Sequence, residues 1–180
     1  MLFNRERCEK IMAKHGLDAL VAASPDNVLY ATNYECVTHW LNKGFQLYSL
    51  FSPGHDPVAS LIAPSLELDA IVDGDVWVDD IYLFSPFLRG PAQTDAMDQV
   101  GRDAKVLSER AHHVGRALDG LVASIESRGL EGARIGVDHT LAAAGELALA
   151  NDLQLRIRAR LDFYPPSGRL QLIMNGVDPA

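Results

Sequence analysis

The sequence predicts an α/β domain, in which a mixed β-sheet carries helices on its faces. Residues 17–23 form an almost continuous apolar run, which is typical of a short strand covered on both faces. Residues 100–125 carry an apolar stripe at helical spacing, and residues 153–161 alternate strictly, as in a half-buried strand. Because strands and helices interleave, packing helices against a mixed sheet buries the apolar faces of both.

The first quarter of the chain is expected to form one helix and two strands. Asn4 can cap the helix, and Gly16 can end it in a left-handed conformation. The buried strand at 17–23 follows. Residues 24–27 have the composition of a turn, and residues 28–32 are then expected to form the next strand.

The next segment is expected to form a hairpin and its surroundings. Residues 45–51 and 58–62 read as two strands joined by a turn that is rich in proline and polar residues. Residues 64–71 are expected to form one or two helical turns, and residues 75–79 a short strand bracketed by acids. Residues 82–93 are expected to be a loop packed on the core.

The second half is dominated by one long helix, which is expected to run from about Thr94 to Gly129. Residues 134–137 read as a strand. Asp138 or Thr140 then caps a third helix that runs to about residue 150. The alternating strand at 153–161 comes next, and the last dozen residues show no clear pattern.

The composition fits one globular domain of ordinary size. The 180 residues are 48% hydrophobic and 22% charged, with a net charge of −8. This charge argues against nucleic acid as a general partner, because phosphate binding needs clustered positive charge. No apolar run approaches the roughly 20 residues that span a bilayer, so no membrane partner is expected. Cys8 and Cys36 are expected to be free thiols in a reducing cytoplasm.

Five aspartates fall close together in the sequence, namely Asp69, Asp73, Asp75, Asp79 and Asp80. Their oxygens suit a divalent cation, but the alternating ligands and the distal glutamate of a calcium loop are absent. Acids that flank a short strand are the favoured interpretation. A magnesium-dependent nuclease using Asp73, Asp75 and Asp79 is disfavoured, because these acids do not lie on successive early strands.

Other candidate chemistry is weaker still. His112 and His113 are adjacent on the predicted long helix, where they point about 100° apart and cannot share one ion. The sequence has no strained Gly-x-Ser-x-Gly turn and no glycine-rich phosphate loop, and residues 167–168 read as a turn. The polar face of 153–161 carries Arg156, Arg158 and Arg160, which suit an exposed edge strand better than an anion site. We therefore predict no catalytic and no metal-binding residue in this chain.

The loop between Tyr34 and Phe45 is the best candidate for binding. It carries His39, Trp40 and Lys43 at the point where the chain leaves the sheet. Loops often carry binding groups, and tryptophan is a common interface anchor. A Trp40 folded back onto the core, with His39 left in solvent, is an equally weighted alternative.

Three segments resemble the creatinase, prolidase and aminopeptidase P family. Residues 17–21 (Leu-Asp-Ala-Leu-Val) and 27–34 (Asn-Val-Leu-Tyr-Ala-Thr-Asn-Tyr) are similar to the family's opening strand and its Asn-x-x-Tyr-x-Thr/Ser-Gly-aromatic motif. Asn33 stands where glycine is usual, and asparagine also tolerates left-handed backbone. Residues 134–138 (Arg-Ile-Gly-Val-Asp) are similar to the second anchor, and the resemblance covers about residues 4–165.

This resemblance implies a ribonuclease-H-like three-layer fold for residues 1–168, with helices on both faces of a mixed sheet. Residues 169–180 are then a tail or the start of an interdomain junction. In the family a pita-bread catalytic domain follows, which in the peptidases holds a pair of divalent metal ions. That domain is absent from this sequence, so no cofactor is expected in this chain and the metal pair belongs to the missing C-terminal domain.

The resemblance also implies a function. The chain is expected to be the non-catalytic N-terminal domain of a hydrolase that cleaves an Xaa-Pro bond or a creatine-like C–N bond. It would form a homodimer and line the substrate pocket, with His39, Trp40 and Lys43 at the substrate rim of the partner subunit. The alternative is a free-standing binding or interaction domain that retains the fold without a catalytic partner domain.

Overall fold

The computed structural model describes residues 2–37, 46–84 and 97–138 in full, and residues 159–164 and 169–174 as backbone. Its helices are α1 (Arg5–His15), α2 (Pro25–Thr32), η1 (Ser65–Glu67), α4 (Leu68–Asp73), α5 (Gln99–Arg110) and α6 (Ala117–Glu126). Its strands are β1 (Ala19–Ala22), β2 (Tyr48–Phe51), β3 (Ala59–Pro64), β4 (Asp80–Phe84), β5 (His112–Val114), β6 (Ile135–Val137), β7 (Ala159–Tyr164) and β8 (Arg169–Met174). None of the helices in these ranges has both the length and the apolar character needed to cross a bilayer.

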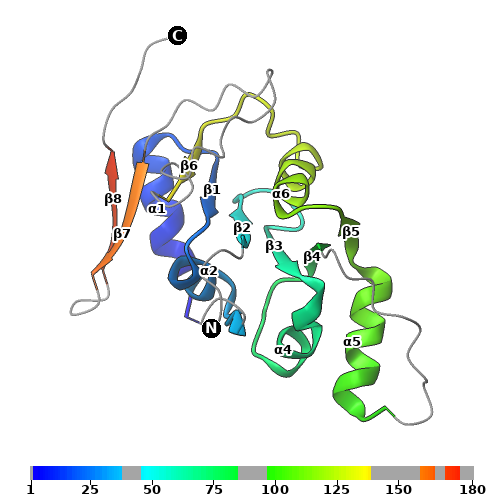
Figure 1. The fold of residues 1–180 in the computed structure, drawn as a ribbon. Helices are drawn as coiled ribbons and strands as arrows, with labels where there is room; N and C mark the ends of the chain where they lie inside the picture. Colours follow the sequence, from blue (N-terminus) through cyan, green and yellow to red (C-terminus); the bar gives the residue numbers. More distant parts are fainter. Residues whose placement is uncertain (1, 38–45, 85–96, 139–158, 165–168, 175–180) are drawn as a thin grey trace.

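Six of these strands form one mixed sheet in the order β5-β4-β3-β2-β1-β6 (Figure 1). Within it β2 is antiparallel to both of its neighbours, while β1–β6, β3–β4 and β4–β5 are parallel pairs. Five strands therefore point one way and β2 points the other. The β2–β3 pair confirms the predicted hairpin.

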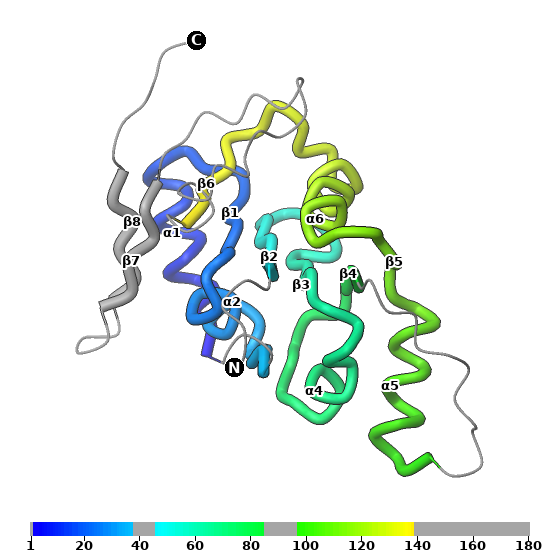
Figure 2. The backbone as a smooth tube through the Cα atoms, viewed as in Figure 1, coloured from blue at the N-terminus to red at the C-terminus, as the bar shows by residue number. Residues whose placement is uncertain are grey.

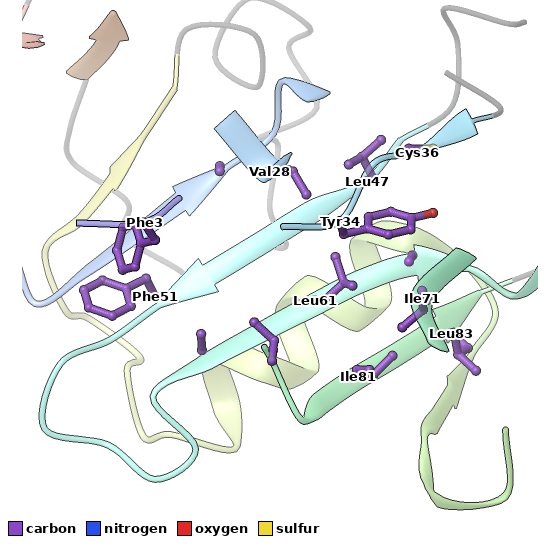
Figure 3. Packing of buried hydrophobic residues seen from close by; sticks show 14 of the residues in the cluster. Phe3, Val28, Tyr34, Cys36, Leu47, Phe51, Leu61, Ile71, Ile81 and Leu83 are labelled. Atoms are coloured by element: carbon purple, nitrogen blue, oxygen red, sulfur yellow. The ribbon is translucent and has the colours of Figure 1, made fainter. Parts of the chain in front are cut away.

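Helices cover both faces of this sheet, which confirms the predicted three-layer α/β architecture. On one face α1, α2, α4 and α5 bury Cys8, Met12, Val28, Leu68, Ile71, Ala104 and Leu107. Figure 3 shows part of this layer, in which Phe3 meets Phe51 edge-on and Leu61 lies among the strands. On the other face α6 buries Ala117, Leu121 and Ile125. The ribonuclease-H-like assignment stays a prediction.

Several local signals had the expected result. Asn4 caps α1, because its Oδ1 accepts a hydrogen bond from the Arg7 amide at 3.0 Å. Gly16 ends the helix with φ at 61°, a left-handed conformation that costs glycine little. β1 is largely buried, as its continuous apolar run predicts, and β6 forms at its expected place.

The predicted strand at 28–32 is wrong, because these residues form the helix α2. Ser24 caps it by accepting from the Asn27 amide at 3.3 Å, and Pro25 occupies the first turn, where its missing N–H costs nothing. Asn33 ends it with φ at 62°. Ser-Pro-Asp is a helix-start signal as well as a turn signal, and the apolar run behind it is too short to separate strand from helix.

The predicted strand at 75–79 is also wrong, since the strand is β4, at Asp80–Phe84. Trp77 instead packs against α2, where its indole N–H donates to the Ala31 carbonyl at 2.9 Å. The predicted loop at 82–93 is wrong for Tyr82–Phe84, which belong to β4, and residues 85–93 lie outside the described residues.

The long helix predicted from Thr94 to Gly129 is divided into α5, β5 and α6. Leu107 of α5 is buried on one face of the sheet and Leu121 of α6 on the other. The apolar stripe is continuous in sequence, but it serves two opposite layers. Gly120 allows α6 to approach closely, because a Cβ there would meet Ile62 Cγ2 at 3.0 Å.

The C-terminal predictions are tested only in part. The third helix, capped by Asp138 or Thr140, lies outside the described residues. The alternating strand overlaps β7, whose described backbone begins at Ala159. The last dozen residues show no clear pattern in the sequence, yet Arg169–Met174 form β8, which pairs antiparallel with β7. The assignment of 169–180 to a tail or junction stays a prediction.

Gly136 of β6 shows why a glycine occupies the Arg-Ile-Gly-Val-Asp segment. A Cβ at this position would lie 2.7 Å from Leu20 Cδ2 and 3.1 Å from Leu17 Cδ1. Leu17 is buried and Leu20 packs against the same cluster under α1, so an added methyl group would force at least one of these side chains to shift.

We expect Gly136→Ala to lower the free energy of unfolding by roughly 1–3 kcal/mol, the usual cost of overpacking a core. The matched control is Gly115→Ala, whose Cβ would meet nothing closer than Asp119 Oδ2 at 3.6 Å. Urea unfolding followed by circular dichroism measures both. Equal urea midpoints for the two variants would show that the β1–β6 contact accommodates the added methyl group without loss of stability.

Candidate functional site

The candidate binding loop is anchored by a buried carboxylate at its N-terminal end. Glu67 lies in η1, directly after β3, and is only 6% exposed. Its Oε2 accepts hydrogen bonds from the Tyr34 hydroxyl at 2.6 Å and from the Val37 amide at 3.0 Å. The Cys36 thiol donates to Oε1 at 3.6 Å. The Tyr34 hydroxyl, the Cys36 thiol and the Val37 amide, at the N-terminal end of the loop, are thus all hydrogen-bonded to the one side chain of Glu67.

The electrostatics of this anchor keep the Tyr34 hydroxyl neutral. Burial, reinforced by the hydrogen bond with Glu67, raises the pKa of the Tyr34 phenol far above its ordinary value. Tyr34 therefore remains a hydrogen-bond donor at any physiological pH. The predicted rim residues His39, Trp40 and Lys43 lie outside the described residues, so the structure describes the anchor of their loop and not the loop itself.

We expect Glu67→Gln to destabilise the fold by roughly 1–3 kcal/mol, because an amide group replaces one acceptor oxygen in a site full of donors. The matched control is Glu35→Gln, an exposed acid two residues before Val37, which should change the free energy of unfolding by less than about 0.5 kcal/mol. Chemical unfolding of both variants gives the comparison. If Glu67→Gln unfolded at the wild-type midpoint, the anchor would be energetically unimportant.

A second carboxylate joins two of the segments that sequence analysis singled out. Asp138 follows β6 and is completely buried. Its Oδ2 accepts from the amides of Ala23 and Ser24, at 2.8 and 2.7 Å, and from the Asn27 side chain at 3.2 Å. The Asn27 and Arg134–Asp138 segments are over a hundred residues apart in sequence and meet here. Their residues fix the β1–α2 corner.

A small cavity lies beside this corner, between α1, α2 and the strands β1, β2 and β6. It has a volume of about 30 Å³, and Asn27, Ser49 and Asp138 contribute to its lining. The buried Ser49 hydroxyl has no hydrogen-bond partner among the described residues. This space is enough for a water molecule and far too small for a substrate. We therefore interpret the corner as structural.

A third cluster surrounds Asp80 at the start of β4. Arg128 Nη2 lies 2.9 Å from Asp80 Oδ2, and the Ser60 hydroxyl donates to the same oxygen at 2.7 Å. His112 Nε2 lies 3.3 Å from Oδ1, and its ring stacks on Tyr82 with centroids 4.5 Å apart. The Ser60 hydroxyl donates to a carboxylate that is already paired with the Arg128 guanidinium, so Ser60 is not activated as a nucleophile.

The histidines and most of the aspartates that were candidates for chemistry lie at the surface. His112 and His113 lie on β5 and not on a helix, because this short strand pairs with β4. Asp73 is the last residue of α4, and Asp75 and Asp79 lie in the segment between α4 and β4. All three are exposed, and none is on a strand. Across the described residues, no three His, Cys, Asp or Glu side chains come together as metal ligands.

The remaining candidates divide between described and undescribed residues. Cys8 and Cys36 form no disulfide, as predicted, and both are buried. Burial raises the pKa of the Cys8 thiol to about 12, so it carries little thiolate. Arg156, Arg158 and residues 167–168 lie outside the described residues, and Arg160 belongs to β7, which is described only as backbone.

Sequence reasoning missed Glu67 and Arg128. Glu67 follows the apolar strand β3 but lies close to Asp69 and Asp73, so nothing in the sequence distinguishes it from these neighbouring acids. Arg128 sits just before Gly129 at a helix end, where a basic residue usually faces solvent, so its burial had no signal in the sequence.

Comparison with known proteins gives one matching family and several similar solved structures. Residues 4–157 match the Creatinase/Prolidase N-terminal domain family. Among solved structures, the chain is similar to the N-terminal domain of Xaa-Pro dipeptidase from Lactobacillus brevis, with 13% identity, a TM-score of 0.46, and coverage of 83% of this chain and 87% of that one. No curated protein sequence matches the chain.

Two further structures are similar at the same level of identity. A proline dipeptidase from Streptococcus pneumoniae shares 12% identity with a TM-score of 0.32, covering 67% of this chain and 96% of that one. Prolidase from Pyrococcus furiosus shares 14% identity with a TM-score of 0.30, covering 64% of this chain and 36% of that one. Because the family match spans most of its length, the chain belongs to the creatinase/prolidase N-terminal domain family.

Proposed function

We propose that this chain is the non-catalytic N-terminal domain of a creatinase-like or Xaa-Pro-peptidase-like hydrolase, where it serves dimerisation and lines the substrate pocket. The family match over residues 4–157 carries the proposal. The described polar clusters agree with it, because each is a satisfied structural network. The carboxylates of Glu67, Asp80 and Asp138 all accept hydrogen bonds from the chain's own groups.

The substrate rim in this proposal is the loop that carries His39, Trp40 and Lys43. Support comes from the anchor at its N-terminal end, since Glu67 fixes the position of Val37, one residue before the undescribed stretch. A binding loop on a rigid base loses less conformational freedom when it engages a ligand. We assign no metal to this domain and place the divalent pair of the peptidases in a C-terminal catalytic domain. The protein is proposed to be cytoplasmic, consistent with its two free thiols.

Sedimentation of the purified chain tests the dimerisation half of this proposal. A dimer at micromolar concentration is expected, and a chain that stays monomeric up to about 1 mM would contradict it. The rim half is tested in the protein in which this domain is joined to a catalytic domain. There Trp40→Ala should raise KM for an Xaa-Pro dipeptide more than it lowers kcat, because it removes binding and not chemistry. Unchanged kinetics would remove Trp40 from the substrate rim.

A further inference from the structure

The N-terminal segment, the end of α2 and the end of α4 come close together (Figure 2). A surface groove lies between them. Its volume is about 540 Å³, within the range of ordinary ligand pockets. The side chains that matter for its chemistry are Leu2, Leu29, Val37, Glu35, Asp73 and Asp75. None of the three clusters described above contributes its carboxylate to this groove.

The groove exposes apolar surface. Leu2 is 60% exposed and Val37 is 54% exposed, and both line it together with the half-buried Leu29. Only four large apolar side chains are exposed in the described part of the chain, so two of the four meet in one place. Apolar side chains that gather on a polar surface mark an interaction site more often than scattered ones do.

The charges around this apolar surface have one sign. Glu35, Asp73 and Asp75 are exposed, and every charged side chain among the described lining residues is acidic. Like charges held near one another repel, and a cationic partner would relieve that repulsion. The groove thus combines exposed apolar side chains with exposed acidic ones.

The walls of the groove are held together by Asn33. Its Oδ1 accepts from the Leu2 amide at 3.0 Å, and its Nδ2 donates to the Asp75 carbonyl at 3.2 Å. One side chain therefore connects the N-terminal segment, α2 and the segment after α4. Such a preformed groove requires little rearrangement to bind a partner.

We propose that this groove binds an extended cationic segment of a partner protein, in which apolar side chains alternate with lysine or arginine. Alternate side chains of an extended peptide point in opposite directions. The apolar ones would lie on Leu2 and Val37. The basic ones start out away from the groove, and their long flexible stems would bend over its edge to reach Glu35, Asp73 and Asp75. This inference does not depend on the hydrolase assignment, because it rests on the apolar and acidic side chains of the groove and not on His39, Trp40 or Lys43.

A fluorescein-labelled peptide of alternating lysine and leucine is the probe, and fluorescence anisotropy measures its dissociation constant. Asp73→Asn/Asp75→Asn should weaken binding roughly tenfold, since each exposed ion pair contributes up to about fivefold. Val37→Ser should also weaken it severalfold. The matched control is Glu126→Gln/Glu131→Gln, which removes two exposed acids elsewhere and makes the net charge less negative by the same two units. It should leave the affinity within about twofold.

Three results would overturn the proposal. The first is equal weakening by the two double variants, which would mean nonspecific attraction to an acidic protein. The second is equal binding of a lysine–serine peptide, which would remove the apolar contribution. The third is self-association of the unliganded chain that Asp73→Asn/Asp75→Asn abolishes, which would assign the groove to a second copy. All substituted positions are exposed, so an unchanged circular dichroism melting curve should accompany each variant.

Discussion

Arg128→Met lowers the free energy of unfolding by about 3–5 kcal/mol, the largest effect we expect from a single substitution. The Arg128 side chain is only 3% exposed, and its partner Asp80 is 9% exposed. Its Nε donates to the Pro57 carbonyl at 3.1 Å and its Nη1 to the Ser124 carbonyl at 3.0 Å. Methionine fills similar volume but leaves the Asp80 carboxylate buried without its counter-charge.

The comparison that isolates burial is Arg116→Met. Arg116 makes a shorter ion pair, 2.6 Å to Asp119, but the pair is exposed and screened by water. We expect no resolvable change in its urea midpoint. The double variant Arg128→Met/Asp80→Leu should regain part of the lost stability, because it removes the uncompensated charge. A midpoint for Arg128→Met equal to that of Arg116→Met would show that the buried pair does not stabilise the fold.

Asp138→Ala is expected to cost about 3–4 kcal/mol, since each hydrogen bond to a charged acceptor contributes roughly 1.5–3 kcal/mol and the effects are not additive. The substitution leaves the amides of Ala23 and Ser24 and the Asn27 side chain without their shared acceptor. It also disconnects β6 from the start of α2. Thermal and urea unfolding of the purified variant measure the loss.

A graded control accompanies this prediction. Asp18 is exposed, and its carboxylate accepts one backbone hydrogen bond, from the Arg134 amide at 2.7 Å. Asp18→Ala should therefore cost only about 1 kcal/mol. Similar losses for Asp18→Ala and Asp138→Ala would indicate that the buried corner is no more important than the exposed one.

The sequence was sufficient for elements whose signal is local and of the right length. Asn4 and Gly16 bound α1 because capping depends on a few neighbouring atoms. Residues 17–23 indicated a buried strand because an apolar run of that length fits a central position in a sheet. The order of the family-like segments predicted the family, which the match over residues 4–157 shows.

The errors arose where tertiary packing decides between local alternatives. Ser24–Asn27 is consistent with both a turn and a helix start, and the contacts of Asp138 with the Ala23 and Ser24 amides favour the helix. The stripe from Val100 to Ile125 has helical spacing throughout, but pairing with β4 extends His112–Val114 into a strand. A single periodicity does not reveal that its two halves face opposite sides of a sheet.

The functional residues were harder still, because burial of a charge depends on partners distant in sequence. Glu67 meets Tyr34, Cys36 and Val37 across at least thirty positions, and Arg128 meets Asp80 across 48. Several aspartates are close together in the sequence, but their surroundings in the fold differ. Asp80 is half-buried and paired, while Asp73 and Asp75 are exposed. Sequence proximity and spatial convergence are different properties.

We propose that this domain folds and binds but does not break bonds by itself. The most direct test of this proposal is an assay of the purified chain with Xaa-Pro dipeptides and with creatine, in the presence and absence of added divalent metal. We expect no product above the no-protein control from a chain that circular dichroism shows to be folded. Metal-dependent or metal-independent hydrolysis that persists after rigorous purification would contradict it.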